Sequence, residues 1–514
     1  MTTHSPRPAR RPNILLITSD QQRADCYGFE GRKVKTPHLD ALAGEGTRFS
    51  ACITPNVVCQ PSRASMLTGL LPSAHGVSDN GIDLPEATGL SGFAGVLSRD
   101  GYATGMIGKA HFSSYHTFAP TGTPECVQSS AQYDTSWSGP YMGFGQNDLM
   151  LIGHNYWLPA EPPRGLAYEA WYHNDGKGAQ KNAAYAGYAP RTATPQTYHS
   201  QLPPVWHNST WVGNKTIDFL REHRDEPFCA WVSFPDPHHP FDAPEPWSLL
   251  HHPDEVDIPE HRTRDLDRRP WWHRASVETV PKLSGELLKM RSEYSRMGEL
   301  NDAQLRELTA NYYGMISLID HNVGRILAEL DDLGLAEDTI VIYTTDHGDF
   351  LGDHGLVLKG PMMYDGLMRV GMIMRGPGIE AGRVIGDPVS TLDLCATILD
   401  YCGATPDAEL DSTSLRPLLE GEGSRDFAYS EWDLRAGRVG VALDLRTVRT
   451  QRYRMTSEVR SQSGELYDLQ EDPHELVNRY DDPSYASVRR ELADMIAGAR
   501  RDIPTPDLPI VGTA

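Results

Sequence analysis

Three short apolar runs along the chain are each followed directly by a group of polar side chains. Residues 13–18, 228–234 and 339–345 are apolar on both faces, which predicts strands buried inside a parallel sheet. Between the last two runs, a segment of roughly residues 302–333 places apolar residues at i, i+3 and i+4, as an amphipathic helix does. Strand, helix and strand in this order predict a doubly wound α/β sheet.

The same patterning predicts one main domain with an insertion. We expect residues 13–402 to form this domain, after a flexible lead at residues 1–12. Within it, residues 126–206 are rich in Tyr, Trp, Gly, Pro and Asn and have no sustained periodicity. Such composition predicts an irregular insertion over one face of the sheet, which could shape a substrate pocket.

The last part of the chain predicts a smaller C-terminal α+β subdomain, residues 403–502. It contains β-rich segments at 439–445 and 447–455 and a helical segment at 487–501. The Pro-rich tail, residues 503–514, cannot be regular structure, so we expect it to be free or to pack on another subunit. A homo-oligomer is therefore plausible.

Composition narrows the classes of partner. The chain has 514 residues, and 47 Lys and Arg against 69 Asp and Glu give a formal net charge of −22, which opposes binding to nucleic acids and anionic membranes. No run approaches the ~20 apolar residues of a membrane span, and the first apolar run is too short for a signal peptide. We therefore expect a cytoplasmic protein. Seven scattered cysteines without a C-x-x-C pair indicate neither a disulfide framework nor a zinc ribbon.

The first candidate for chemistry is Cys59-Gln-Pro-Ser-Arg63, followed by Ala-Ser-Met-Leu-Thr-Gly69. It looks like a loop that enters a helix, since Pro61 suits a first helical turn. A nucleophile at this end would face free backbone N–H groups and the positive end of the helix dipole, which suits an anionic substrate. Arg63 adds a fixed cation. Taken alone, a Cys before a helix is more often a small buried apolar residue.

The whole pattern, C-x-P-S-R followed by A-S and T-G, resembles the signature of the sulfatase family. The resemblance implies the alkaline-phosphatase-like fold, a mixed α/β sheet sandwiched by helices, and hydrolysis of organic sulfate monoesters by S–O cleavage. It also implies that a formylglycine-generating enzyme converts Cys59 to formylglycine. The hydrated aldehyde would attack sulfur and later expel sulfate by collapsing back to the aldehyde, so that water need not attack a hindered sulfur.

Two polar pairs at strand ends are the candidate metal ligands. Asp20-Gln21 follows the first predicted strand, and Asp346-His347 follows the third. Oxygen-rich sets suit Ca²⁺, Mg²⁺ or Mn²⁺, and one imidazole favours Mn²⁺ or another transition metal. The resemblance implies that these four residues, with Cys59, bind one divalent cation, Ca²⁺ or Mn²⁺. The family carries an acidic pair at the first position. Here Gln21 replaces the second acid, as in the related phosphonate monoester hydrolases, and still offers an amide oxygen.

A third segment, residues 101–111, resembles the family pattern G-Y-x-T…G-K-x-H. Lys109 and His111 lie two residues apart, so both side chains would point to one face of an extended chain. The resemblance implies that they hold the formylglycine and that His111 assists the elimination of sulfate.

Three further positions follow from the resemblance. Residues 237–241 match P-H-x-P-F, which assigns His238, rather than His239, to neutralise the sulfate or to protonate the leaving alkoxide. Lys359, in a K-G…Y-D segment, would be a second cation on the transferring group. Asn80 resembles a position that contacts substrate.

Alternatives remain open at this point. A phosphonate monoester or phosphodiester hydrolase with the same formylglycine site shares Gln21 and the Asp-His pair. Lys109, His111 and Ser62 favour sulfate, because those hydrolases tend to carry Tyr and Thr at the first two positions and often lack the Ser. A silent binding protein would keep an intact Cys59 thiol, and a two-zinc phosphatase would need more His or Asp ligands. The alcohol part of the substrate could be aryl, sugar or choline-like.

Overall fold

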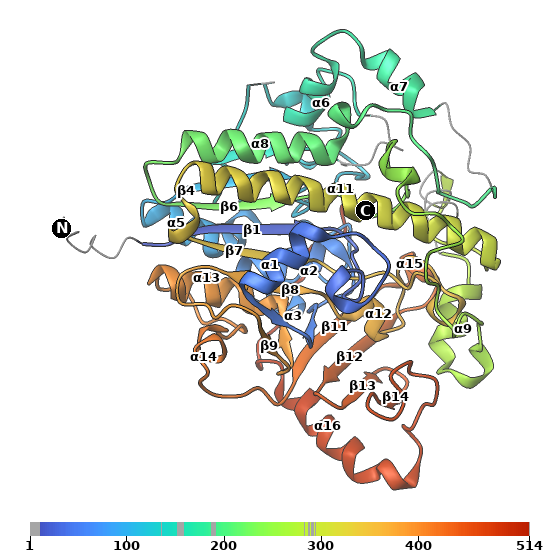
Figure 1. Ribbon diagram of the computed structural model, residues 1–514. Helices are drawn as coiled ribbons and strands as arrows, with labels where there is room; N and C mark the ends of the chain where they lie inside the picture. Colours follow the sequence, from blue (N-terminus) through green and yellow to red (C-terminus); the bar gives the residue numbers. More distant parts are fainter. Residues whose placement is uncertain are drawn as a thin grey trace.

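The computed structural model describes residues 11–512 except 135, 152–158, 187–191, 282, 286–287, 289–291 and 293–294. Most of the lead and the last two residues of the tail lie outside this range. In the described part of the chain, the large sheet has eight strands (Figure 1). Their order across the sheet is β5 (Gln146–Leu149), β4 (Ala103–Gly108), β6 (Phe228–Ser233), β1 (Asn13–Ser19), β7 (Thr339–Thr345), β8 (Met372–Arg375), β2 (Thr47–Phe49) and β9 (Arg383–Ile385).

Strands β4, β6, β1 and β7 run parallel in the middle of this sheet. Ile14 of β1 is paired with Cys229 of β6 on one side and with Ile340 of β7 on the other. Because parallel strands point the same way, their carboxyl ends lie along one edge of the sheet. β8 is antiparallel to β7, so the sheet is mixed, and the predicted α/β class is confirmed.

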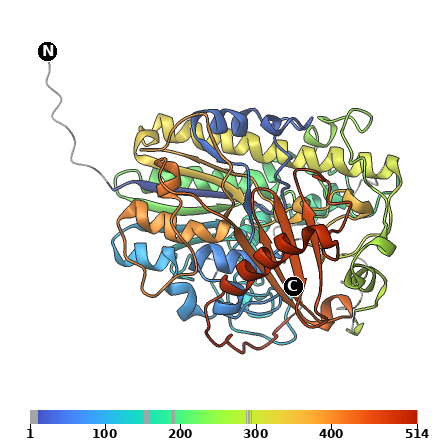
Figure 2. The ribbon, with the colours of Figure 1, turned by 90° about the horizontal axis from the view of Figure 1, so that it is seen from below.

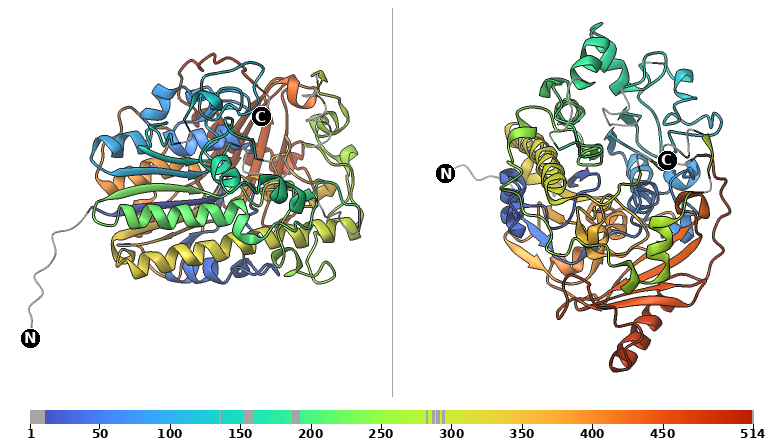
Figure 3. Two further views of the ribbon diagram at one scale, coloured as in Figure 1. Left: turned by 90° about the horizontal axis from the view of Figure 1, so that it is seen from above. Right: turned by 90° about the vertical axis from the view of Figure 1, so that its right-hand side faces the viewer.

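Helices cover both faces of the sheet because alternate side chains of each strand point to opposite sides. Leu15 and Ile17 of β1 belong to a buried cluster with α1 (Pro37–Glu45), α8 (Asn208–Glu222) and α11 (Asp302–Asp332). Ile14 and Leu16 belong to a second cluster on the other face, with α2 (Cys59–Thr68), α5 (Phe93–Arg99) and α13 (Leu394–Cys402). Figure 3 shows α8 and α11 side by side over the first face.

The long amphipathic helix is present as α11, which has 31 residues and begins with an Asn301 capping box. None of the helices in the described ranges is both long and apolar enough to cross a membrane. The shorter helices are α3 (Pro72–His75), α4 (Glu86–Leu90), α9 (Trp271–Glu278), α12 (Asp365–Met368) and α14 (Arg416–Leu419).

The insertion at residues 126–206 contains more regular structure than its sequence pattern predicts. It supplies β5, which joins the large sheet next to β4, and the helices α6 (Ala167–His173) and α7 (Gly178–Ala186). β5 was missed because its sequence, Gln-Asn-Asp-Leu, lies at the sheet edge and carries no apolar run. Parts of this insertion, at 135, 152–158 and 187–191, lie outside the described residues.

The C-terminal region forms a separate antiparallel sheet (Figure 2). Its strands are β11 (Ala428–Leu434), β12 (Leu443–Arg449), β13 (Tyr453–Glu458) and β14 (Ser463–Asp468), and α16 (Ala486–Gly498) packs on it through Leu492 and Ile496. The predicted strand at 439–445 begins later, because residues 436–439 form the short helix α15 (Ala436–Val439). A two-stranded pair, β3 (Cys52–Ile53) with β10 (Val389–Ser390), lies against β11 of this sheet.

The described part of the tail packs on its own chain, which corrects the expectation that it is free. The amides of Val511 and Gly512 donate to the carbonyl of Gly81, at 2.8 and 3.2 Å. The amide of Phe118 donates to Val511 O at 2.8 Å. Residues 511 and 512 of the tail therefore lie beside the loop that carries Asn80.

Candidate active site

The predicted site residues converge on the carboxyl edge of the four parallel strands. Each of these strands is followed by a loop that carries two polar side chains, and all of them except Asp236 are predicted site residues. They are Asp20 and Gln21 after β1, Asp346 and His347 after β7, Lys109 and His111 after β4, and Asp236 and His238 after β6.

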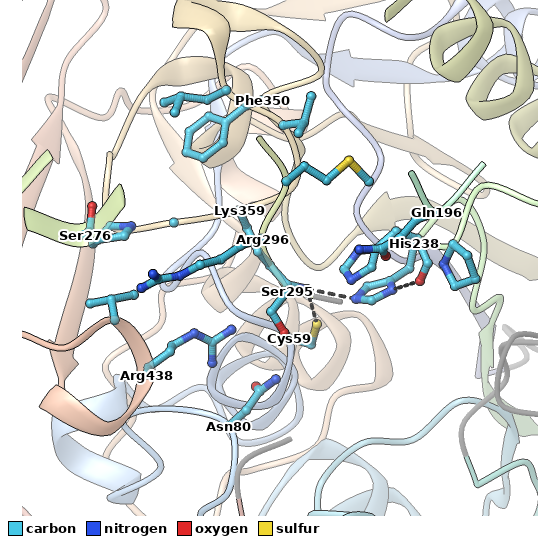
Figure 4. A pocket seen from close by; sticks show the side chains of 18 of the residues that line it. Cys59, Asn80, Gln196, His238, Ser276, Ser295, Arg296, Phe350, Lys359 and Arg438 are labelled. Atoms are coloured by element: carbon cyan, nitrogen blue, oxygen red, sulfur yellow. Dashed lines mark hydrogen bonds between the residues drawn. The ribbon is translucent and has the colours of Figure 1, made fainter. Parts of the chain in front are cut away.

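Cys59 faces this edge from the first turn of α2. Val58, just before the helix, is extended, and its amide donates to the side chain of Asn56 at 2.9 Å, which fixes the helix entry. The Cys59 side chain is 1% exposed. Its Sγ lies 3.0 Å from Lys359 Nζ and 3.1 Å from His347 Nε2, as Figure 4 shows for the lysine.

The charges around Cys59 favour an anion at its position. Burial alone raises the pKa of the Cys59 thiol, but the positive charges of Lys359, His347 and Lys109 outweigh burial and hold that pKa well below its usual range. The side chain of His111 also hydrogen-bonds the thiol. An atom that develops negative charge at this position therefore lies among several cationic groups.

Four residues have ligand atoms close enough together to hold one metal ion. The ligand atoms of Asp20, Cys59, Asp346 and His347 all lie within 4.8 Å of one another, and all four residues are buried. The His347 Nδ1–H donates to Gly348 O at 2.9 Å, so in the neutral ring the lone pair is on Nε2, the nitrogen beside Cys59 that would bind a cation.

Gln21 completes this donor set with an amide oxygen. Its backbone adopts φ 67°, its amide N–H donates to Asp346 Oδ1 at 3.1 Å, and its side-chain Nε2 donates to Asp349 Oδ2 at 2.5 Å. The remaining atom, Oε1, is buried and has no hydrogen-bond partner among the described residues. An orphaned buried oxygen beside two carboxylates and an imidazole fits a divalent cation.

Asp349 was missed by the sequence analysis. It accepts from Gln21 and from the amides of Leu351 and Leu358, so it orients both the glutamine and the loop that leads to Lys359. Burial raises the pKa of Asp349 to about 6. The sequence feature that could have identified Asp349 as a site residue is its position three residues after Asp346.

Arg63 lies behind the cavity rather than at its wall. The side chain is completely buried, and its Nε donates to Asp346 Oδ2 at 2.9 Å while Nη2 donates to Asp20 Oδ2 at 3.3 Å. Nη1 donates to Lys109 O and to Ser233 Oγ. The guanidinium therefore fixes the two carboxylates relative to the ends of β4 and β6.

Lys109 and His111 both line the cavity, but not for the predicted reason. His111 has φ 56°, so the chain turns there instead of continuing extended. Lys109 Nζ donates to Asp20 Oδ2 at 2.6 Å. Burial and the Cys59 sulfur both raise the pKa of Asp20. The positive charges of Lys109 and Arg63 outweigh these effects and lower that pKa to about 2.

Glu125, which was also missed, holds the turn at His111. Its carboxylate accepts from the amides of Phe112 and Ser113 at 3.0 Å, from the amide of His111 and from Tyr141 OH. Burial raises the pKa of Glu125 to about 7 despite these donors. No pattern in the sequence links Glu125 to this turn.

His238, Lys359 and Asn80 line the same cavity. His238 Nδ1–H donates to the carbonyl of His239 at 2.6 Å, so its Nε2 accepts from Lys359 Nζ at 3.0 Å. Asn80 Oδ1 accepts from the amide of Gln60 at 3.0 Å, which leaves the Asn80 amide group to face the cavity. The structure thus brings all eleven predicted site residues to one place, with Arg63 behind it.

A second buried cluster, His207, Asp236 and Asp242, also has ligand atoms within 4.8 Å of one another. His207 Nδ1, however, accepts the amide N–H of Ser209 at the start of α8. Burial lowers the pKa of His207 to about 3, so the ring is neutral and its one proton is on Nε2. Since neither ring nitrogen then offers a lone pair, this cluster does not fit a metal.

Comparisons with known proteins agree with this geometry. A sequence model described as "Sulfatase" matches residues 12–404, and one described as "N-sulphoglucosamine sulphohydrolase, C-terminal" matches residues 352–502. The chain is 29% identical over 504 residues to an arylsulfatase from Clostridium perfringens (strain 13 / Type A), covering 92% of this chain and 91% of that protein. It is 28% identical over 510 residues to the multifunctional alkaline phosphatase superfamily protein PehA from Trinickia caryophylli, covering 94% of each. The crystal structure of a phosphonate monoester hydrolase of Agrobacterium radiobacter matches with a TM-score of 0.75 and 28% identity, covering 95% of both chains.

Proposed function

Because this chain belongs to the sulfatase family, as its Cys59 motif predicts, we propose that it hydrolyses organic sulfate monoesters through a formylglycine formed from Cys59. The reaction would consume water and release the alcohol and sulfate. The observation that carries the proposal is the position of Cys59 at the start of α2, within 3.1 Å of both Lys359 and His347. Once formed, the hydrated formylglycine supplies the hydroxyl that attacks sulfur.

Asp20, Gln21, Asp346 and His347 would hold one divalent cation, with the residue at position 59 beside it. Three oxygen donors and one imidazole suit Mn²⁺ or Ca²⁺. When bound, the cation supplies Lewis-acid polarisation of a sulfate oxygen and lowers the pKa of a neighbouring hydroxyl. Arg63 is a positioning residue here, because it contacts the two carboxylates and does not line the cavity.

The cations at the wall stabilise charge that develops on the substrate. Lys359 and Lys109 line the cavity beside Cys59, where the sulfate group would bind, and a well-placed donor of this kind contributes ~3–4 kcal/mol to transition-state stabilisation. In the resting arrangement, Lys359 holds the proton shared with His238 Nε2, so this pair can deliver a proton to the leaving oxygen. His111, whose backbone amide donates to Glu125, hydrogen-bonds the side chain at position 59 and would accept a proton when sulfate leaves.

Hydrolysis of phosphonate monoesters is the second candidate, and two observations favour it. Gln21 stands where the family carries a second acid, and the chain is 28% identical to a phosphonate monoester hydrolase of known structure. Lys109 and His111 favour sulfate monoesters as the main substrates. Turnover of both classes would follow from a shared nucleophile and metal.

Mass spectrometry of the peptide that contains Cys59, with activity measured on the same sample, tests the proposal. Protein made with a formylglycine-generating enzyme should show a peptide ~18 Da lighter than the thiol form and should hydrolyse 4-nitrophenyl sulfate. Cys59→Ala should abolish turnover, while Cys52→Ala, at another buried cysteine, should not. An intact Cys59 thiol without turnover would overturn the proposed nucleophile. The ratio of kcat/KM for 4-nitrophenyl sulfate to that for 4-nitrophenyl phenylphosphonate decides between the two substrate classes.

A further inference from the structure

The cavity above Cys59 is lined by charged groups of one sign. Among the described residues at its wall there are lysines and arginines but no Asp or Glu, although acids outnumber bases in the chain by 69 to 47. The cationic residues at the wall are Lys109, Arg264, Arg296, Lys359 and Arg438. A cavity of this kind attracts anions and concentrates them.

Three of these cations already have a role. Lys109 and Lys359 contact Asp20 and Cys59 at the catalytic end. Arg264 donates to the backbone carbonyls of Gly355 and Met297, at 2.9 and 3.1 Å, and so joins two loops. The two remaining cations, Arg296 and Arg438, have no such role. Arg296 lies in the connection between α9 and α11, and Arg438 lies in α15.

Among the residues that the structure describes, Arg296 has no carboxylate that offsets its charge. Its Nη1 donates to Thr279 O at 2.7 Å. Within the described part of the chain, its Nη2 is buried without a hydrogen-bond partner, and no acid pairs with it. A half-buried cation without a counterion is costly, so a bound anion would stabilise this arrangement.

Arg438 lies close to Arg296 and is held in place. Its Nη1 donates to Asp79 Oδ1 at 2.7 Å, and its guanidinium lies 5.5 Å from the ring centroid of Trp432. Both side chains line the same cavity wall, and burial, followed by the charge of Arg438, lowers the pKa of Arg296. Figure 4 shows both arginines on one side of Cys59 and His238 on the other.

We propose that Arg296 and Arg438 form a subsite for a second anionic group, a carboxylate or a second sulfate, on the alcohol part of the substrate. The preferred substrate would then be an organic sulfate with two negative charges. Asp79 offsets Arg438, so one positive charge is left over, which matches one additional anion. The planar guanidinium fork suits both carboxylate and sulfate oxygens. Val277, Met297 and Val439 line the same cavity and give an apolar surface for the carbon frame between the two anions.

This inference rests on the proposed function, and paired substrates test it. Each pair joins a substrate with two negative charges to an analogue that carries only the sulfate charge. 3- and 4-carboxyphenyl sulfate are paired with the corresponding carboxamides. 1,3- and 1,4-phenylene disulfate are paired with the corresponding methoxyphenyl sulfates. Sulfate release by ion chromatography gives kcat/KM for each member. The quantity of interest is the ratio of kcat/KM within a pair, followed across variants, because leaving-group reactivity then cancels.

Arg296→Gln and Arg438→Gln remove the subsite, and Arg435→Gln is the matched control. Arg435 precedes α15, three residues from Arg438, and does not line the cavity. The unchanged enzyme should have a higher kcat/KM for at least one dianionic substrate than for the other member of its pair. Each subsite variant should lower this ratio of kcat/KM at least about tenfold, mainly by raising KM for the dianionic substrate. The control should keep it. Equal unfolding midpoints and equal formylglycine content establish that the variants are comparable.

Two results would overturn the inference in distinguishable ways. If neutral aryl sulfates are hydrolysed but no pair shows a preference that depends on Arg296 and Arg438, the subsite is refuted and the proposed function stands. If no sulfate is hydrolysed and the Cys59 thiol is intact, the proposed function fails and the subsite fails with it. The pair that responds, carboxylate or disulfate, identifies the second anion.

Discussion

Replacement of Arg63 by Met should destabilise the fold much more than loss of an exposed arginine that also pairs with a carboxylate. Arg63 is completely buried between Asp20 and Asp346, at 3.3 and 2.9 Å. Removal of one partner from a buried ion pair costs about 3–5 kcal/mol, because the remaining charge is left without compensation. Most of this cost should fall on Asp346, since Asp20 keeps Lys109 at 2.6 Å.

Arg221→Met provides the comparison. Arg221 binds Glu329 through two hydrogen bonds of 2.8 and 2.9 Å, but its side chain is 59% exposed. Water and salt screen such a pair, so its loss should cost about 0–1 kcal/mol. The two substitutions remove the same group, but Arg221 is exposed with one carboxylate partner, whereas Arg63 is buried, has two carboxylate partners and also donates to Lys109 O and Ser233 Oγ.

Urea unfolding followed by tryptophan fluorescence, with EDTA and separately with Mn²⁺, measures both costs. With EDTA, the Arg63 substitution should lower the free energy of unfolding by several times the effect of the Arg221 substitution. With Mn²⁺ the difference should shrink, because a cation between the two carboxylates replaces part of the lost positive charge. If Arg63→Met costs no more than Arg221→Met in EDTA, the assignment of Arg63 as the group that holds the carboxylates is refuted.

Three further outcomes are expected. Lys359→Met should lower kcat/KM for 4-nitrophenyl sulfate about 100- to 1000-fold. The control Lys215→Met, which breaks a surface ion pair with Asp148, should leave kcat/KM unchanged. Equal effects of the two substitutions would contradict the role of Lys359. Burial raises the pKa of Asp320 to about 7, so the folded protein keeps a proton that the unfolded chain loses, and the free energy of unfolding should fall as pH rises from about 4 to about 7. Asp320→Asn should remove up to ~1.4 kcal/mol of that fall per pH unit in urea titrations, and an unchanged pH dependence would contradict this. Deletion of residues 503–514 removes two backbone hydrogen bonds to Gly81, next to Asn80, and one from Phe118, each contributing ~1 kcal/mol. It should raise KM more than it lowers kcat, and an unchanged KM would contradict a bracing role for the tail.

The sequence predicted those parts of the site that depend on local patterning. Apolar runs locate β1, β6 and β7, and parallel strands deliver the residues that follow them to one edge. The Cys59 motif predicted a helix start, and α2 begins at that residue. These inferences need only the period of a strand and the chemistry of a helix end.

The groups that orient the site depend on contacts between distant parts of the chain. Glu125 reaches the turn at His111 from a segment without periodicity, and Arg296 and Arg438 meet from regions more than 140 residues apart in the numbering. No local rule encodes such pairs. The turn at His111 likewise arises from tertiary hydrogen bonds, which override the extended conformation that the spacing predicted.

The two ends of the cavity come from different parts of the architecture. The groups around Cys59 follow the parallel strands of the large sheet, whereas the arginines come from the α9–α11 connection and from α15, next to the C-terminal sheet. Mutations in the outer wall can therefore accumulate without disturbing the chemistry at the strand ends. A gene duplicate could acquire a new substrate through a few exchanges in these two segments, and grafting them between relatives is a direct route to an engineered change of specificity.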